Sequence, residues 1–322
     1  MMREPISGLM GYSPTTRGLY RLQHSADKPT AKDDFPFLLS LMLPRSCARR
    51  SDFLRSLRLW RFYASYFSIN LYRSAPLPAN GKYIFGYHPH GILSHGAFAA
   101  FATEALGFSY LFPSIENSLL TLDSNFRIPI YRDYLLSLGM NSVSRSSCEK
   151  ILTSGGPDGQ GTGRAITIVI GGAKESLEAV PNSMRLVLRS RKGFIKLGIR
   201  TGATLVPVLA FGENDLYTVV TDLDPSSVSG WIQLLFKKVL GFTVPFLYSK
   251  GPYKMDLGIT PHRRPVNVVV GRPISTRKMA DPLNEEGYVE EVHARYIEEL
   301  QRIWDEWKDV FAESRVGDMV IL

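Results

Sequence analysis

Residues 83–96 read YIFGYHPHGILSHG and contain three of the chain's six histidines. An apolar, aromatic run ends in the turn HPHG (88–91), and a helical pattern begins near Ser94. Short runs of this composition are typical of buried strands. In α/β proteins, the loop that leaves the carboxyl end of such a strand is where ligands bind. We therefore predict a strand that is followed by a site-forming turn.

Similar patterns recur along the rest of the chain. Short apolar runs bounded by glycine or proline predict strands at 82–87, 165–170, 204–210 and 266–270. Helical patterns lie between and after them, at 94–105, 192–202 and about 287–312. This alternation predicts a single α/β domain with a mostly parallel sheet flanked by helices.

Composition and net charge limit the kinds of partner that the protein is expected to bind. The 322 residues are 44% hydrophobic and 21% charged, which is typical of a globular protein. The net charge of +8 favours an anionic partner, such as nucleic acid, a membrane surface or a phosphorylated ligand. No recognised nucleic-acid module accompanies this charge, so we predict no nucleic-acid partner. The two cysteines, Cys47 and Cys148, exclude a disulfide framework and a cysteine-rich zinc site.

The first 75 residues differ from the rest. Residues 1–34 lack the apolar core of a secretory signal and predict a mobile tail. The run FPFLLSLMLP (35–44) is too short to cross a bilayer, since a spanning helix needs about 20 residues. Residues 45–73 combine seven arginines with regularly spaced aromatic residues. We predict a membrane-associating segment at 35–75, with a basic amphipathic helix in the lipid interface. The alternative is a solvated helix that covers the core.

The histidines allow three interpretations. A metal site would need a further acid and histidine in a matching motif, and the chain offers none, so we predict no metal. A single core histidine would be ordinary, but a histidine pair in a strand-ending turn is not. A neutral imidazole there can take a proton from an alcohol, and we predict that His90 is a general base. Amides near Gly91 or Gly172 are candidates to stabilise an oxyanion.

A second loop accompanies this turn. A buried strand is followed by Gly171, Gly172 and a helix that carries Glu175. Because this loop opens at the same sheet edge as His90, Glu175 is a candidate to orient an imidazole or hold a substrate hydroxyl. The alternative is that Glu175 only favours the first turn of its helix through the macrodipole.

Two further stretches stand out. Six basic residues and no acid lie between 185 and 200, which suits a phosphorylated carrier such as coenzyme A or, alternatively, a solvated basic face. Residues 155–163 (GGPDGQGTG) contain five glycines but lack the Lys-Ser/Thr ending of a P-loop. We predict a flexible connection there.

Five blocks occur in this order along the chain: YIFGYHPHG, NFRIPIYRDYLLSLG followed by VSR, VIGGAKESL, RKGFIKLGIRTGATLVPVLAFGEN and VVVGRPI. In this order they resemble the blocks of the type 2 diacylglycerol acyltransferase family, which includes monoacylglycerol and wax-alcohol acyltransferases. The resemblance extends from about residue 49 to about residue 312.

This resemblance implies an enzyme that esterifies a lipid alcohol with acyl-CoA, most simply diacylglycerol to triacylglycerol. It implies His90 as the catalytic base, supported by His88 and Glu175. It implies no cofactor beyond acyl-CoA as co-substrate. The residues in matching motifs that we assign to acyl-CoA binding are Gly91, Arg145, Gly171, Gly172, Arg191, Lys192, Gly193, Phe194, Phe211, Gly212, Glu213 and Asn214.

The chain departs from related patterns in two places. A more distant likeness to the glycerol-phosphate acyltransferases implies an acid five residues after the catalytic histidine, where this chain has His95. The acid must then come from elsewhere, with Glu175 as first candidate and Glu104 in reserve. The family usually carries a long hydrophobic hairpin before the histidine motif, which this chain replaces by the shorter segment 35–75.

The expected protein is an acyltransferase domain at 76–322 attached to the endoplasmic reticulum membrane or a lipid-droplet surface. Its active site should face the cytosol, and a homo-oligomer is compatible with the sequence. Two alternatives stay open. One is a monoacylglycerol or wax-alcohol acyltransferase, and the other is a catalytically silent lipid-binding or droplet-coating protein.

Overall fold

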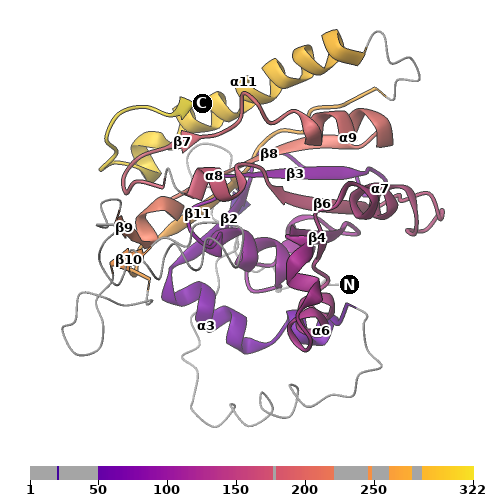
Figure 1. Ribbon diagram of the computed structural model, residues 1–322, viewed down its shortest axis with the longest axis horizontal. Helices are drawn as coiled ribbons and strands as arrows, with labels where there is room; N and C mark the ends of the chain where they lie inside the picture. Colours follow the sequence, from indigo (N-terminus) through magenta and orange to yellow (C-terminus); the bar gives the residue numbers. More distant parts are fainter. Residues whose placement is uncertain (1–19, 22–49, 177–178, 221–245, 249–260, 278–284) are drawn as a thin grey trace, which may run out of the picture.

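The computed structural model describes residues 20–21, 50–176, 179–220, 246–248, 261–277 and 285–322, and the structural statements below concern these residues. The predictions for the run 35–44 and for most of the tail 1–34 therefore lie outside the described residues. An eight-stranded sheet forms the centre of the molecule, with helices on both of its faces (Figure 1). In order across the sheet, its strands are β1 (Tyr20–Arg21), β2 (Ile69–Arg73), β11 (Val266–Val270), β8 (Thr204–Phe211), β3 (Tyr83–His88), β6 (Arg164–Val169), β4 (Glu116–Thr121) and β5 (Asn141–Ser142).

The sheet is mostly parallel, as predicted. Strand β3 lies between β8 and β6 and runs parallel to both. Parallel pairs also join β6 to β4, β4 to β5 and β2 to β11, whereas β11 runs antiparallel to β8 and β1 antiparallel to β2. The four predicted strands correspond to β3, β6, β8 and β11. The carboxyl end of β3, where the HPHG turn begins, therefore lies near the middle of the sheet.

Alternating residues of β3 supply two separate cores. Tyr83, Phe85 and Tyr87 pack into the core on one face, and Ile84 packs into the core on the other. This period of two follows from the pleat of a strand. Both cores exclude water from β3, which is buried along its whole length.

Each core is covered by its own helices (Figure 1). One face carries α7 (Arg145–Thr153), α9 (Gly193–Thr201) and α11 (Glu285–Phe311). The other face carries α3 (Arg58–Tyr66), α4 (His95–Ala97), the π-helical turn η1 (Phe98–Ala102), α5 (Phe108–Leu111) and α6 (Tyr131–Ser137). The remaining helical elements are α2 (Asp52–Arg55), η2 (Asp123–Arg127), α8 (Gly172–Ser176) and η3 (Glu213–Leu216). Two small sheets complete the described elements. One pairs β7 (Arg185–Leu186) with β12 (Val320–Ile321), and the other pairs β9 (Thr218–Val220) with β10 (Phe246–Tyr248).

The helix predicted at 94–105 is shorter than expected. It spans α4 and η1 and ends before Thr103, whose backbone is extended. The buried guanidinium of Arg55 donates hydrogen bonds to the carbonyls of Phe101 and Ala102 and pairs with Glu104. These bonds satisfy carbonyls at the end of the helix, which would otherwise have no partner.

The prediction of one basic amphipathic helix in 45–73 is wrong for the part that the structure describes. Two short helices, α2 and α3, are separated at Leu57, whose backbone is extended, and the chain then enters β2. Trp60, Ala64 and Phe67 are buried in the core. Since β2 belongs to the central sheet, the folded unit begins N-terminal to residue 76. None of the helices in the described ranges has the length and apolarity needed to cross a bilayer.

Candidate active site

The HPHG turn leaves β3 at the carboxyl edge of the sheet, as predicted. Gly91 has a φ of +57°, a conformation that favours glycine. A Cβ atom added to Gly91 would lie 2.7 Å from Cγ of Glu213, so a side chain does not fit there. The turn is therefore packed tightly against the loop that follows β8.

His90 is oriented by a backbone carbonyl. Its Nδ1 lies 3.0 Å from the carbonyl oxygen of Gly91, so the Nδ1–H donates to that oxygen. This hydrogen bond leaves Nε2 as the basic nitrogen of the ring. Burial lowers the pKa of His90, which keeps the imidazole neutral at physiological pH. A neutral imidazole with an unprotonated Nε2 is the form that a general base requires.

Glu175 contacts the backbone of His90 and not its imidazole. Its Oε1 accepts a hydrogen bond of 2.5 Å from the amide of His90, and its Oε2 accepts one of 2.7 Å from the amide of Val187. Burial raises the pKa of Glu175 to about 7, and the two amides and the charge of Arg191 oppose this shift. Glu175 thus fixes the position of the turn, while the Gly91 carbonyl orients the ring.

Glu213 holds the other end of the histidine stretch. It follows β8 in η3, is 1% exposed, and its Oε2 accepts hydrogen bonds from the Tyr87 hydroxyl at 2.6 Å and the Gly96 amide at 2.9 Å. Burial raises the pKa of Glu213 to about 7. We assigned Glu213 to acyl-CoA binding, but the structure places it inside the protein, beneath the turn. The sequence signal that could have indicated this buried position is an acidic residue shortly after a buried strand.

His88 is a core residue. It is fully buried, and its Nε2 lies 3.2 Å from the hydroxyl of Tyr296 on α11. Burial lowers the pKa of His88 to about 3, so its ring is neutral. The Tyr296 hydroxyl in turn donates to the Gly86 carbonyl. His88 therefore helps to attach α11 to the end of β3, and its supporting role in catalysis stays a prediction.

His95 joins three elements. Its Nδ1 contacts the hydroxyl of Tyr63 on α3, and its Nε2 lies 2.7 Å from the hydroxyl of Tyr217 after η3. Its ring also stacks on that of Tyr217. Burial lowers the pKa of His95 to about 4. This tyrosine–histidine–tyrosine bridge could not be predicted from the sequence, because its members lie far apart in the chain.

Four of the residues assigned to acyl-CoA line one cavity of about 500 Å³ between α7 and α9. These residues are Arg145, Arg191, Gly193 and Phe194, and Lys196 and Arg200 lie beside them. The guanidinium of Arg191 donates to the carbonyl of Gly171, in the loop that leads to Glu175. The cavity therefore adjoins the loop that positions the histidine turn. In contrast, Lys192 pairs with Glu290 of α11 and is not part of the lining.

The FGEN block (211–214) lies on another side of the turn. The ring of Phe211 is buried and stacks on Trp304, and the side-chain amide of Asn214 donates to the Ser183 carbonyl. Phe211, Gly212 and Asn214 border a second cavity of about 510 Å³, which also touches Pro89. Gly172 is the remaining glycine predicted to bind acyl-CoA. A Cβ atom added to it would meet no atom within 4 Å, so the space beside Gly172 is open. Within the described residues, no three His, Cys, Asp or Glu side chains are grouped so as to hold a metal ion.

Comparison with known proteins gives a consistent set of relatives. A sequence model described as diacylglycerol acyltransferase matches residues 35–321. Diacylglycerol O-acyltransferase 2B from Umbelopsis ramanniana is 48% identical over 281 residues, covering 87% of this chain and 78% of that protein. Diacylglycerol O-acyltransferase 1 from Schizosaccharomyces pombe is 46% identical over 271 residues, covering 84% and 76%. The bovine 2-acylglycerol O-acyltransferase 1 is 40% identical over 265 residues, covering 82% and 77%.

Among solved structures, the 1-acyl-sn-glycerophosphate acyltransferase PlsC from Thermotoga maritima aligns with a TM-score of 0.41 at 13% identity. The alignment covers 82% of this chain and 87% of that one.

Proposed function

Because the chain belongs to the diacylglycerol acyltransferase family, we propose that it transfers a fatty acyl group from acyl-CoA to the free hydroxyl of diacylglycerol, forming triacylglycerol. The observation that carries the mechanism is the orientation of His90. Its Nδ1–H is held by the Gly91 carbonyl, so Nε2 is available to accept a proton.

The reaction is a direct transfer. Nε2 of His90 removes the proton from the acceptor hydroxyl as the oxygen attacks the thioester carbonyl. The tetrahedral intermediate collapses, the new C–O ester bond remains and the C–S bond breaks. The imidazolium then returns its proton to the leaving coenzyme A thiolate. The acyl group passes directly from the thioester to the acceptor oxygen, and no covalent enzyme intermediate forms.

The cavity between α7 and α9 suits the phosphates of coenzyme A. Arg145, Arg191, Lys196 and Arg200 place four positive charges in its lining. Arginine and lysine bind phosphate through charge-assisted hydrogen bonds. Because Arg191 also contacts the loop before Glu175, a donor bound there would lie next to the histidine turn. The thioester would then be within reach of the base.

The protein is also proposed to bind the endoplasmic reticulum membrane or a lipid droplet from the cytosolic side. Helix α3 exposes Leu59 and Phe62, which are 39% and 43% accessible, beside Arg58 and Arg61. Apolar side chains flanked by arginines are the composition that inserts between anionic lipid headgroups. This placement would bring a lipid acceptor to the same side of the sheet as α3.

The acceptor is tested by lipid analysis of cells that lack neutral-lipid synthesis. Cells expressing this chain should accumulate triacylglycerol, and a matched strain expressing His90→Ala should not. Accumulation of wax esters, or a requirement for supplied monoacylglycerol, would assign a different acceptor within the family. No new neutral-lipid class at equal protein level would contradict the proposed activity and favour a silent lipid-binding protein.

A further inference from the structure

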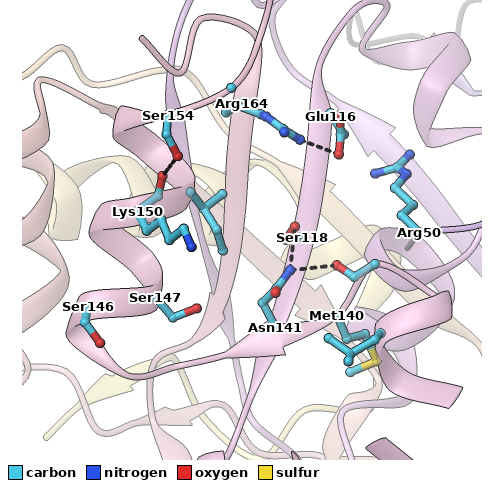
Figure 2. Close-up of a pocket in the computed structure, with 14 residues that line it drawn as sticks. Arg50, Glu116, Ser118, Met140, Asn141, Ser146, Ser147, Lys150, Ser154 and Arg164 are labelled. Carbon is cyan, nitrogen blue, oxygen red and sulfur yellow. Dashed lines mark hydrogen bonds and ion pairs between the residues drawn. The ribbon is translucent and has the colours of Figure 1, made fainter. Parts of the chain in front are cut away.

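A third cavity lies away from the histidine turn. It has a volume of about 570 Å³ and lies between α7, β4 and the amino end of β6, as Figure 2 shows. Its charged end is formed by Glu116 and Arg164, the first residues of β4 and β6. The histidine turn follows the carboxyl end of β3, which runs parallel to β6. The charged end of this cavity is therefore at the opposite edge of the sheet from the candidate active site.

This cavity carries a surplus of positive charge. Its lining contains Arg50, Lys150 and Arg164 but a single acid, Glu116, which pairs with Arg164. Arg50 donates to the Asn117 carbonyl at 3.0 Å and pairs with the highly exposed Asp52 outside the lining. Within the described residues, the ammonium of Lys150 has no hydrogen-bond or ion-pair partner. Two positive charges of the lining are therefore not balanced by an acid of the cavity.

Neutral polar groups surround these charges. Helix α7 contributes the hydroxyls of Ser146 and Ser147, Ser154 follows the end of α7, and β5 contributes the side-chain amide of Asn141 (Figure 2). Asn141 is held in place because it donates to Ser118 Oγ at 3.2 Å and to the Gly139 carbonyl at 3.3 Å. No aromatic side chain lines the cavity within the described ranges. A ligand that must stack a base would therefore find no partner, whereas hydroxyl groups would find several.

The glycine-rich stretch 155–163 forms part of this cavity. Gly155 lines it with a φ of +75°, and a Cβ there would lie 2.7 Å from a guanidinium nitrogen of Arg164. Glycine at this position thus lets Arg164 pack beneath the loop and reach the cavity. The sequence analysis predicted only a flexible connection for these residues.

Helix α7 separates this cavity from the one proposed for coenzyme A. Ser146, Lys150 and Ser154 recur at intervals of four and share one face of the helix, which lines the cavity of Figure 2. Arg145 and Cys148, three residues apart, line the cavity on the other side. The two cavities therefore do not share a side chain, and a ligand in one can be tested apart from the other.

We propose that the cavity between α7 and β4 binds a phosphomonoester of a small hydroxylated compound. A phosphomonoester carries close to two negative charges at neutral pH, which suits a lining in which Lys150 has no described ion-pair partner and Arg50 pairs only with the exposed Asp52. The serine hydroxyls and the Oδ1 atom of Asn141, an acceptor, would bind the remaining hydroxyl groups. The same chemistry is presented by a soluble polyol phosphate and by the headgroup of an anionic phospholipid such as phosphatidic acid. This site does not depend on the proposed acyl transfer.

The experiment measures binding of glycerol 3-phosphate to the purified full-length chain in detergent by titration calorimetry, with glycerol as the uncharged probe. Glycerol 3-phosphate should bind and glycerol should not. Lys150→Gln should weaken binding by about tenfold, the loss of one charge-assisted hydrogen bond, and should leave the acyl-transfer rate unchanged. The matched variant Lys196→Gln, in the other cavity, should bind as the parent does. Flotation with phosphatidic acid vesicles, compared with phosphatidylcholine vesicles, tests the lipid source with the same variants.

Two results would support the proposal, and two would overturn it. Lys150-dependent binding of glycerol 3-phosphate supports a soluble ligand, and Lys150-dependent capture by phosphatidic acid vesicles alone supports a lipid headgroup. Binding of either probe that is lost in Lys196→Gln but not in Lys150→Gln would place the anion in the other cavity. Absence of binding in both assays, with Lys150→Gln and the parent equally folded, would also exclude the site.

Discussion

The Oε1 atom of Glu175 lies 2.5 Å from the backbone nitrogen of His90, so a buried carboxylate holds the main chain of the residue proposed as the base. The ring of the same histidine is oriented separately, by the carbonyl of Gly91. In a histidine–acid dyad, one side chain performs the orienting role directly. Here a backbone carbonyl orients the imidazole, and the acid acts one step away, on the turn.

Substitution of Glu175 tests this division of roles. Glu175→Gln presents an NH₂ group to one of two backbone amides, so one buried N–H loses its acceptor. An unsatisfied buried donor costs about 1–3 kcal/mol, and the turn should lose its fixed position. We expect kcat to fall by at least tenfold, while the step of the pH–rate profile that reports His90 is retained because His90 remains the base.

The matched variant is Glu104→Gln, at the reserve candidate for the acid. Glu104 pairs with Arg55 at the end of η1, so its loss should lower stability and not kcat per folded molecule. Steady-state kinetics and thermal unfolding of both variants check this. A fall in kcat confined to Glu104→Gln would show that the acid was assigned to the wrong glutamate.

The second buried carboxylate predicts a pH-dependent stability. Burial raises the pKa of Glu213 from 4.5 to about 7, so the folded state binds a proton that the unfolded state has lost between these pH values. The contribution of Glu213 to the free energy of unfolding therefore falls as pH rises from about 4.5 to about 7. With 1.36 kcal/mol per pKa unit, the full change is about 3 kcal/mol.

Glu213→Gln should remove this dependence. Between pH 5 and pH 7.5, we expect the unfolding free energy of the parent to fall relative to that of the variant. Urea unfolding measures both. A difference that is constant with pH would mean that Glu213 does not titrate in this range.

His95 is expected to matter for stability and not for chemistry. His95→Ala leaves the hydroxyls of Tyr63 and Tyr217 without their shared partner. The loss should be about 2–4 kcal/mol of unfolding free energy, the cost of two unsatisfied groups, with kcat per folded molecule nearly unchanged. Tyr217→Phe removes one of the two bonds and should cost less. A kcat loss in His95→Ala as large as that in His90→Ala would instead place His95 in the reaction.

Membrane association is predicted to be hydrophobic as well as electrostatic. The parent should remain in the membrane pellet after a wash at about 1 M salt, where the Debye length is about 3 Å and charge contacts are screened. Leu59→Ser with Phe62→Ser should increase the released fraction, because both side chains are exposed on α3. Val310→Ser with Val316→Ser, at exposed sites near the carboxyl terminus, is the control. Release of most of the parent by salt alone would contradict this prediction.

The central strands and the position of the histidine turn could be predicted because their signals are local. Buried strands such as β3 and β8 are continuous apolar runs, and the HPHG motif directly follows one of them. The amphipathic pattern of residues 287–312 likewise predicted α11 almost to its observed bounds, Glu285–Phe311. Each of these features depends on residues that are neighbours in the sequence.

The features that were missed depend on distant contacts. The helix predicted in 45–73 is interrupted at Leu57, two residues after Arg55, whose guanidinium donates to the carbonyls of residues 101, 102 and 138. Glu213 matched a family motif, but its position beneath Gly91 follows from the pairing of β8 with β3. The acceptor that orients His90 is a backbone carbonyl, which every residue possesses, so no residue type could have indicated it.

The assignment of His90 as the base is tested by the rate of acyl transfer by His90→Ala relative to the parent, in membranes matched for protein level. General base catalysis contributes roughly 10²–10⁴-fold, so we expect a loss of that size with unchanged membrane association and thermal stability. The step of the pH–rate profile that reports His90 should lie below the ordinary imidazole range, because burial lowers the pKa of His90. Retention of more than about a tenth of the parent rate by a folded His90→Ala variant would contradict the assignment of His90 as the base.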